Sequence, residues 1–203
     1  MTSLLAVIRH GPTEWNELGK IQGRTDIPLS EEGKCVIQQL QLPDFFSGID
    51  WITSPLSRAI ETGKLLGITE MLIDDRLIET NWGDWEGQVL QDLRIKYGQE
   101  MLENEKRGLD LSPPGGESPR QVCQRLQPLL SDIATSGKQK LIGAITHKGV
   151  IRSLLSLATG WDMSEKPSIK LDLKAIHIFS VDCDGDIKPY QLNVKFNKRD
   201  SVS

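Results

Sequence analysis

The sequence predicts an α/β protein with a mostly parallel, mixed sheet flanked by helices, and two observations support this. Short, largely apolar runs recur at residues 4–8, 49–53, 71–73 and 141–146, and buried strands of parallel sheets have this composition. Three of these runs are followed by segments with apolar residues at helical spacing. Strands that alternate with helices in this way are typical of α/β folds.

Length and composition indicate one ordinary globular domain. The chain has 203 residues, of which 38% are hydrophobic and 26% are charged, with a net charge of -4. We therefore expect a single domain over residues 1–203, in which residues 80–117 form a small helical and loop cap. No block of basic residues predicts a nucleic-acid partner, so a phosphate site would need a local concentration of positive charge.

Several features predict a cytoplasmic, soluble protein. The three cysteines, Cys35, Cys123 and Cys183, are odd in number and far apart, which suits a reducing compartment better than a disulfide framework. The first apolar run is too short for a signal peptide and ends in charged residues. No uncharged apolar stretch is long enough to span a membrane, so no membrane partner is expected.

The first half of the chain predicts two strand-to-helix units. After the first strand, residues 19–29 are rich in Gly, Pro and polar residues and predict a loop over the strand end. Ser30 is a good N-cap for the helix that follows. The second strand, at 49–53, leads to a helix that we expect Ser57 to cap, with Arg58 in its first turn.

The middle of the chain is less regular. A third strand is expected at 71–73, and the two tryptophans and two glycines within 76–87 predict an irregular, packed loop. Ser118 and Gln121 have the spacing of a capping box and so predict a helix start. The run at 141–146 predicts a further buried strand, which ends at a histidine and is followed by an amphipathic helix.

The tail predicts two strands joined by a turn, at 175–181 and 191–196, as a hairpin-like end to the sheet. His177 fits a core or sheet position. The acids within 182–186 resemble the start of a calcium loop, but the downstream glutamate that such a loop needs is absent, so we interpret them as turn residues.

Polar groups with a common chemistry lie at the ends of the predicted strands. Arginine and histidine follow the first strand, a Ser-rich segment with an arginine follows the second, and a histidine follows the fourth. The stretches are Arg9-His10-Gly11 with Thr13 and Asn16, Ser54 to Ala59 with Glu61-Thr62, Thr146-His147-x-Gly149, and Glu79 with Trp85-Glu86-Gly87. Carboxyl ends of parallel strands meet at one edge of a sheet, where ligands bind.

Together, these stretches resemble the histidine phosphatase superfamily, also called the phosphoglycerate mutase-like family, from the N-terminus to about residue 160. The resemblance implies a phosphoglycerate mutase-like, three-layer α/β sandwich. It implies that His10 is the nucleophile that forms a phosphohistidine and that Glu79 is the general acid and base. It also implies a phosphate pocket, made by Arg9, Arg58 and His147 with the neutral donors Asn16 and Gln22.

These residue types suit phosphoryl transfer. Fixed positive groups must surround the equatorial oxygens of the phosphoryl group, and the planar fork of Arg binds phosphate oxygens bidentately. A neutral imidazole must attack, and neighbouring arginines favour the neutral form. No third histidine or cysteine accompanies His10 and His147 at ligand spacing, so we expect neither a metal nor another cofactor.

The expected function is therefore a metal-independent phosphomonoesterase that hydrolyses a small phosphorylated metabolite through a phosphohistidine on His10. The alternatives are cofactor-dependent phosphoglycerate mutase-type phosphotransfer and a non-catalytic module that binds phospho-ligands. The segment between Glu79 and the Pro-Gly loop at 113–116 is short compared with that of the glycolytic mutases, and this favours a phosphatase. Lys148 departs from the small or neutral residue usual in the family; it either adds charge at the mouth of the site or faces solvent. The sequence leaves monomer and homodimer open.

Overall fold

The computed structural model describes residues 2–136 and 140–199, and its centre is a six-stranded sheet in the order β4-β3-β5-β1-β6-β7. β1, β5, β3 and β4 are parallel to one another, whereas β6 and β7 add an antiparallel edge. The predicted α/β class with a mostly parallel, mixed sheet is thus confirmed. The strands are β1 Ser3–Arg9, β3 Asp50–Thr53, β4 Leu72–Ile73, β5 Leu141–Thr146, β6 Ile176–Val181 and β7 Ile187–Val194.

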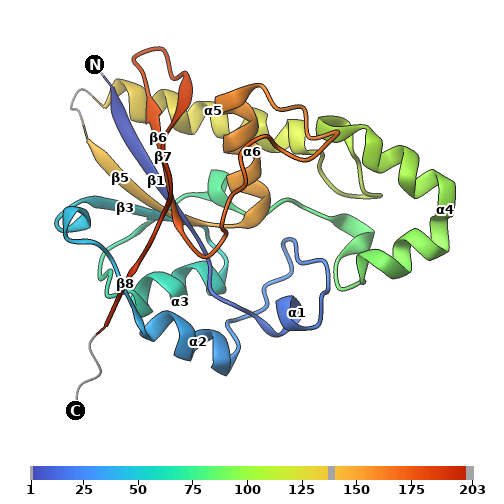
Figure 1. Ribbon diagram of the computed structural model, residues 1–203, viewed down its shortest axis with the longest axis horizontal. Coiled ribbons are helices and arrows are strands. Elements are labelled where there is room, and N and C mark those ends of the chain that lie inside the picture. Colours follow the sequence, from blue (N-terminus) through green and yellow to red (C-terminus); the bar gives the residue numbers. More distant parts are fainter. Residues whose placement is uncertain (1, 137–139, 200–203) are drawn as a thin grey trace.

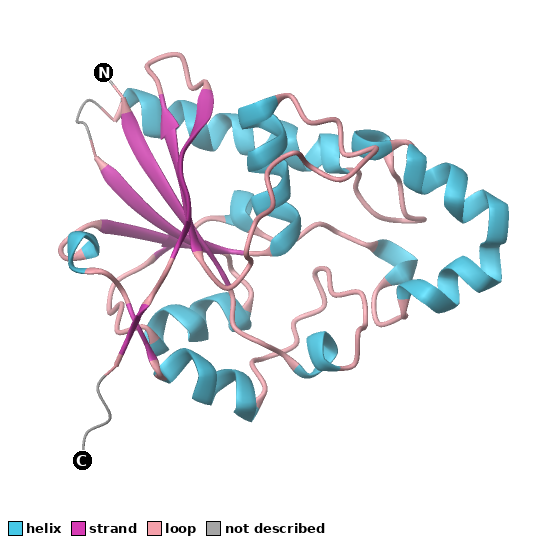
Figure 2. Cartoon of the chain, viewed as in Figure 1, coloured by secondary structure: helices cyan, strands magenta, loops and turns pink. Residues whose placement is uncertain are grey.

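Helices cover both faces of this sheet, which gives three layers (Figures 1 and 2). Alternate side chains of β1 enter different cores: Leu5 and Val7 pack with apolar residues of α5 and α6, whereas Ala6 and Ile8 pack with residues of α2 and α3. Each face of the sheet is therefore buried by its own helix pair, as a three-layer sandwich requires. These helices are α2 Glu31–Gln38, α3 Ser57–Leu65, α5 Pro119–Thr135 and α6 Lys148–Thr159.

A long helix, α4 Leu90–Lys106, extends beyond the sheet (Figure 1). It is broken at Gly98, whose φ of 50° and ψ of -120° are non-helical. Leu93 and Met101 of this helix form a small third core with Trp85. The segment at 80–117 thus has its own apolar cluster next to the main sheet. Its short 3₁₀ turns are η3 Gly83–Trp85 and η4 Gly108–Asp110.

The remaining short elements complete the chain. They are α1 Glu14–Glu17, β2 Leu40–Gln41, η1 Asp44–Phe46, η2 Asp75–Leu77 and β8 Asn197–Lys198, with β2 and β8 forming a two-stranded sheet of their own. Within the described parts of the chain, no helix is long and apolar enough to cross a membrane.

Two local predictions were wrong. Leu56, not Ser57, is the N-cap of α3, because the amide and hydroxyl of Ser57 both donate to Asp26 Oδ1, at 2.9 and 2.8 Å. The last long strand begins at Ile187 rather than near Gln191. Pro189 is tolerated within β7 because this strand is at the edge of the sheet.

Other local predictions were confirmed. Ser30 and Ser118 cap their helices, the latter in a capping box with Gln121. His177 is fully buried in β6. The amides of Asp184 and Asp186 donate to the Asp182 carboxylate, as in a turn.

Candidate active site

The site lies where three parallel strands end side by side. The residues that follow β1 and β3 each donate one further backbone hydrogen bond to β5. The His10 amide donates to Thr146 O, and the Ser54 amide donates to Ile145 O, both at 2.9 Å. This pairing brings His10, Ser54 and His147 to one edge of the sheet. The rings of His10 and His147 have centroids 5.1 Å apart.

His10 is held as a neutral imidazole with one nitrogen available. Its Nδ1 lies 2.7 Å from Gly11 O, and because a carbonyl only accepts, Nδ1 carries the proton and Nε2 the lone pair. Burial, then the charges of Arg9 and Arg58, hold the pKa of His10 well below its usual 6.5. His10 therefore meets the requirement for a nitrogen nucleophile at neutral pH.

Arg58 lies in the first turn of α3 and is fully buried. Its Nη1 donates to Thr25 O at 3.1 Å, and its Nη2 donates to Gly23 O at 2.7 Å. The loop at 19–29 therefore orients the guanidinium. The Nε atom is buried and has no partner.

His147 follows β5 and is fully buried. Its Nε2 lies 2.7 Å from Ser54 Oγ, while burial, and then the charges of His10 and the nearby arginines, hold its pKa well below 6.5. If the Ser54 hydroxyl donates to Nε2, the neutral ring carries its proton on Nδ1. That Nδ1 is buried without a partner.

Asn16 and Gln22 form a polar cluster with Thr13. Thr13 caps the short helix α1, and its hydroxyl and the Asn16 amide both donate to Gln22 Oε1, at 3.0 and 3.2 Å. These bonds fix the orientation of the Gln22 amide. Its Nε2 donor is buried and unpartnered.

Unpartnered donors thus converge at the site. Six buried side-chain nitrogens in the described residues lack a hydrogen-bond partner, and four of them belong to predicted site residues. Leaving a buried donor unsatisfied costs about 1–3 kcal/mol. A bound anion would satisfy such donors. The four atoms are Arg9 Nε, Gln22 Nε2, Arg58 Nε and His147 Nδ1.

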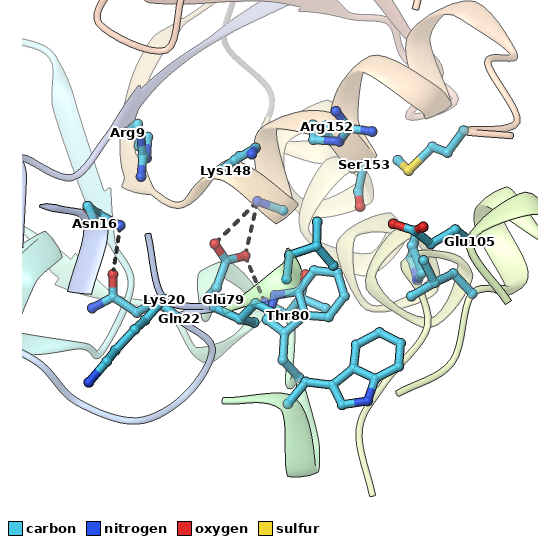
Figure 3. Close-up of a pocket in the computed structure, with 18 of the residues that line it drawn as sticks. Arg9, Asn16, Lys20, Gln22, Glu79, Thr80, Glu105, Lys148, Arg152 and Ser153 are labelled. Atoms are coloured by element: carbon cyan, nitrogen blue, oxygen red, sulfur yellow. Dashed lines mark hydrogen bonds between the residues drawn. The ribbon is translucent and has the colours of Figure 1, made fainter. Parts of the chain in front are cut away.

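Glu79 faces this cluster from the loop after η2 and is 5% exposed. Its carboxylate accepts from the amides of Thr80 at 2.8 Å and Gly149 at 3.1 Å (Figure 3). Burial raises the pKa of Glu79, although these amides and the charges of Arg58 and Arg9 oppose the shift. Glu79 can therefore hold a proton at higher pH than an ordinary glutamate.

Two carboxylates connect the loop that holds Arg58 to the loop that holds Glu79. Glu86 accepts four hydrogen bonds, from the backbone amides of residues 24, 25 and 82 and from the Thr25 hydroxyl. Glu117 accepts from the Asn81 amide at 3.0 Å and from Arg24 at 3.2 Å. Hydrogen bonds therefore join the loop that orients Arg58 to the loop that contains Glu79.

Sequence reasoning missed Arg125 of α5. Its Nη1 and Nη2 atoms donate to Arg76 O and Ile78 O, at 2.5 and 2.6 Å, so that it holds the backbone immediately before Glu79. Nothing in the local sequence indicates this role, because the contacts span 49 and 47 residues.

A cavity of about 510 Å³ opens onto these groups. His10, Arg9, Asn16, Gln22 and Glu79 line it. Arg58 and His147 are fully buried. The structure thus brings all seven predicted residues together. The lining also includes residues that sequence reasoning did not identify, among them Lys20, Arg94, Glu105 and Arg152.

This geometry, with a histidine among buried N–H donors and opposite a protonatable carboxyl, has the groups that phosphoryl transfer needs. The chain matches the histidine phosphatase superfamily (branch 1) over residues 5–190 and belongs to that family. It is accordingly an enzyme of the phosphatase or phosphotransferase class. The predicted family is thus confirmed.

Relatives carry both phosphatase and mutase names. The chain is 28% identical over 200 residues to a 2,3-bisphosphoglycerate-dependent phosphoglycerate mutase of Parvibaculum lavamentivorans, covering 92% of this chain and 94% of that protein. It is also 28% identical to phosphoserine phosphatase 1 of Hydrogenobacter thermophilus, covering 79% of this chain and 78% of that protein. A mycobacterial glucosyl-3-phosphoglycerate phosphatase solved with VO3 shares the fold at 23% identity, with a TM-score of 0.75 and coverage of 95% and 100%.

Proposed function

We propose that the protein is a metal-independent phosphomonoesterase that hydrolyses a small phosphorylated metabolite through a phosphohistidine on His10. The observation that carries this proposal is the group of four unpartnered buried donors around His10. These donors match the acceptor oxygens of a phosphoryl group. They are N–H groups, which stabilise phosphate charge without a metal ion.

In the first step, the lone pair of His10 Nε2 forms the N–P bond while the bond from phosphorus to the ester oxygen breaks. The departing oxygen takes the proton of the Glu79 carboxyl, and the raised pKa of Glu79 supports this acid role. Arg9, Arg58, Gln22 and His147 hold the three equatorial oxygens.

In the second step, a water oxygen forms a bond to phosphorus as the N–P bond breaks and its electrons return to His10. Glu79, now a carboxylate, takes the water proton. Inorganic phosphate leaves, and both residues regain their starting protonation states. Hydrogen bonding of Nδ1 to Gly11 keeps the ring in one tautomer throughout.

The test is a panel of phosphorylated metabolites and p-nitrophenyl phosphate, assayed in EDTA with the wild-type protein and His10→Ala. We expect phosphate release that survives EDTA and is lost in His10→Ala, with an acid-labile phosphohistidine on a peptide containing residue 10. A strict requirement for a divalent ion, or equal turnover by the variant, would refute the mechanism.

Mutase-type phosphotransfer is the second candidate, because several relatives carry that name. The two functions differ in the acceptor of the phosphohistidine, which is water or a second hydroxyl. Phosphorus NMR of 3-phosphoglycerate separates them. Release of inorganic phosphate without 2-phosphoglycerate excludes a mutase as the main activity.

A further inference from the structure

We propose that Lys148 and Arg152 bind a second acidic group of the substrate, so that the enzyme acts on small phosphomonoesters that carry a further carboxylate or phosphate. This inference rests on the proposed function and names the substrate class for the same cavity.

The two side chains share one wall of the cavity. Lys148 and Arg152 are the first and fifth residues of α6, and residues four apart lie on the same face of a helix. Both line the cavity that contains His10 and Glu79. In the view of Figure 3, Lys148 lies between Arg9 and Arg152.

Lys148 and Arg152 lack a paired carboxylate among the described residues, although Glu79 is close enough for its charge to raise the pKa of Lys148. No carboxylate within residues 2–136 and 140–199 forms an ion pair or hydrogen bond with Lys148 or Arg152. Arg94 lines the same cavity but is paired with Glu105 at 2.7 Å, so its charge is already neutralised. Two unpaired cations on one wall leave a place for an anion.

The charges are close enough to oppose one another. Partial burial, then the neighbouring charges of Arg152 and Arg9, lowers the pKa of Lys148, whereas the charge of Glu79 raises it. The charges that lower the pKa of His10 are instead those of Arg9 and Arg58. Because Lys148 lies between Arg9 and Arg152 in Figure 3, an anion held by Lys148 and Arg152 would lie on the side of Lys148 away from Arg9.

Arg152 is also held in position. Its Cζ lies 4.6 Å from the centroid of the Trp161 ring, and the Trp161 Nε1 donates to Glu165 O at 2.9 Å. Stacking on a ring leaves the edge of a guanidinium available for bidentate bonds to a carboxylate or phosphate. Little side-chain freedom would be lost on binding, and this favours affinity.

The test compares matched substrates that differ in the second acid. Glycerol 3-phosphate and 3-phosphoglycerate differ by a carboxylate, and fructose 6-phosphate and fructose 1,6-bisphosphate differ by a phosphate. We expect the wild-type kcat/KM to favour at least one acidic partner by about tenfold or more. Lys148→Met and Arg152→Met should each lower that selectivity ratio about tenfold, because each removes a charge-assisted hydrogen bond.

Lys96→Met is the matched control. Lys96 is an exposed cation on α4 that lies outside the cavity lining, so its loss should leave both kcat/KM values unchanged. The inference is overturned if the wild type shows no preference for either diacid, or if Lys148→Met and Arg152→Met leave the ratio as it was.

A binding measurement separates this inference from the proposed function. Calorimetry of the wild-type protein with 3-phosphonopropionate and with propylphosphonate requires no turnover. Tighter binding of the carboxylate ligand, lost in Lys148→Met, supports the second anion site even if hydrolysis is absent. Hydrolysis of p-nitrophenyl phosphate with equal binding of the two phosphonates overturns this inference alone.

Discussion

Replacing Gly149 with alanine should displace the Glu79 carboxyl while leaving residue 79 a glutamate. A Cβ at position 149 would lie 2.4 Å from Glu79 Oε1 and 2.2 Å from Thr80 Oγ1. Ordinary contact begins near 3.4 Å, so the Glu79 carboxyl must move by about 1 Å. A 1 Å misplacement of a reacting group can cost about 100-fold in rate, which is about 2.7 kcal/mol.

The loss should depend on the leaving group. Alkyl phosphates need a proton on the departing oxygen, whereas p-nitrophenolate leaves readily without one. We therefore expect Gly149→Ala to lower kcat/KM by about 100-fold for an alkyl phosphate such as glycerol 3-phosphate. The loss for p-nitrophenyl phosphate should be at least tenfold smaller.

Gly63→Ala serves as the control for packing. Gly63 also lies in a helix, α3, but its Cβ would meet the side chains of Met71 and Ile145, neither of which lines the cavity. This variant should lower the thermal midpoint with no leaving-group dependence. If Gly149→Ala is folded and both substrates lose activity equally, or neither does, the acid role of Glu79 is refuted.

Three further predictions follow from the site. Ser54→Ala removes the hydroxyl that is hydrogen-bonded to Nε2 of His147 and should lower kcat/KM about tenfold by weakening phosphate binding. A matched loss of inorganic phosphate affinity in calorimetry checks this. For an alkyl phosphate, kcat/KM should fall at high pH as Glu79 loses its proton, with a pKa above the 4.5 of an ordinary glutamate. It should also fall at low pH as His10 gains a proton, with a pKa below the ordinary 6.5. A kcat/KM that rises at high pH would contradict the acid role of Glu79. Glu86→Gln removes a carboxylate that accepts four hydrogen bonds and should reduce unfolding free energy by about 1–3 kcal/mol, measured by denaturant titration against the exposed control Glu70→Gln.

The strand-end residues could be predicted from the sequence because each follows a local apolar run. Arg9, His10 and His147 are placed by backbone pairing of β1 with β5, so identifying the two strands brings them together. Arg58 lies in the first turn of α3, and the start of this helix is also indicated by residues that are near in the sequence. The short apolar pattern of a buried strand thus predicts much of the site.

The supporting contacts could not be predicted, because they join distant parts of the chain. Ser54 and His147 are 93 residues apart, as are Arg24 and Glu117. Ser57 shows how such contacts override local preference: a capping residue by type, it is bonded to Asp26 from 31 residues away. Side-chain partners across this separation depend on the packed fold rather than on neighbouring residues.

Substrate binding should itself favour the acid form of Glu79. In the structure, the charges of Arg58 and Arg9 lower the pKa of Glu79 against the larger effect of burial. A phosphate dianion would neutralise these arginines and add negative charge nearby, and both changes raise the pKa of the carboxyl. The proton would then be present when the leaving oxygen needs it.

Calorimetry in buffers of different ionisation enthalpy measures this proton uptake. At pH 7, binding of propylphosphonate to the wild-type protein should take up more protons than binding to Glu79→Gln, which cannot titrate. The ligand's own protonation is common to both proteins and cancels in the difference. Equal uptake by the two proteins would show that Glu79 does not change its protonation on binding, and the acid would then have to be protonated before the substrate arrives.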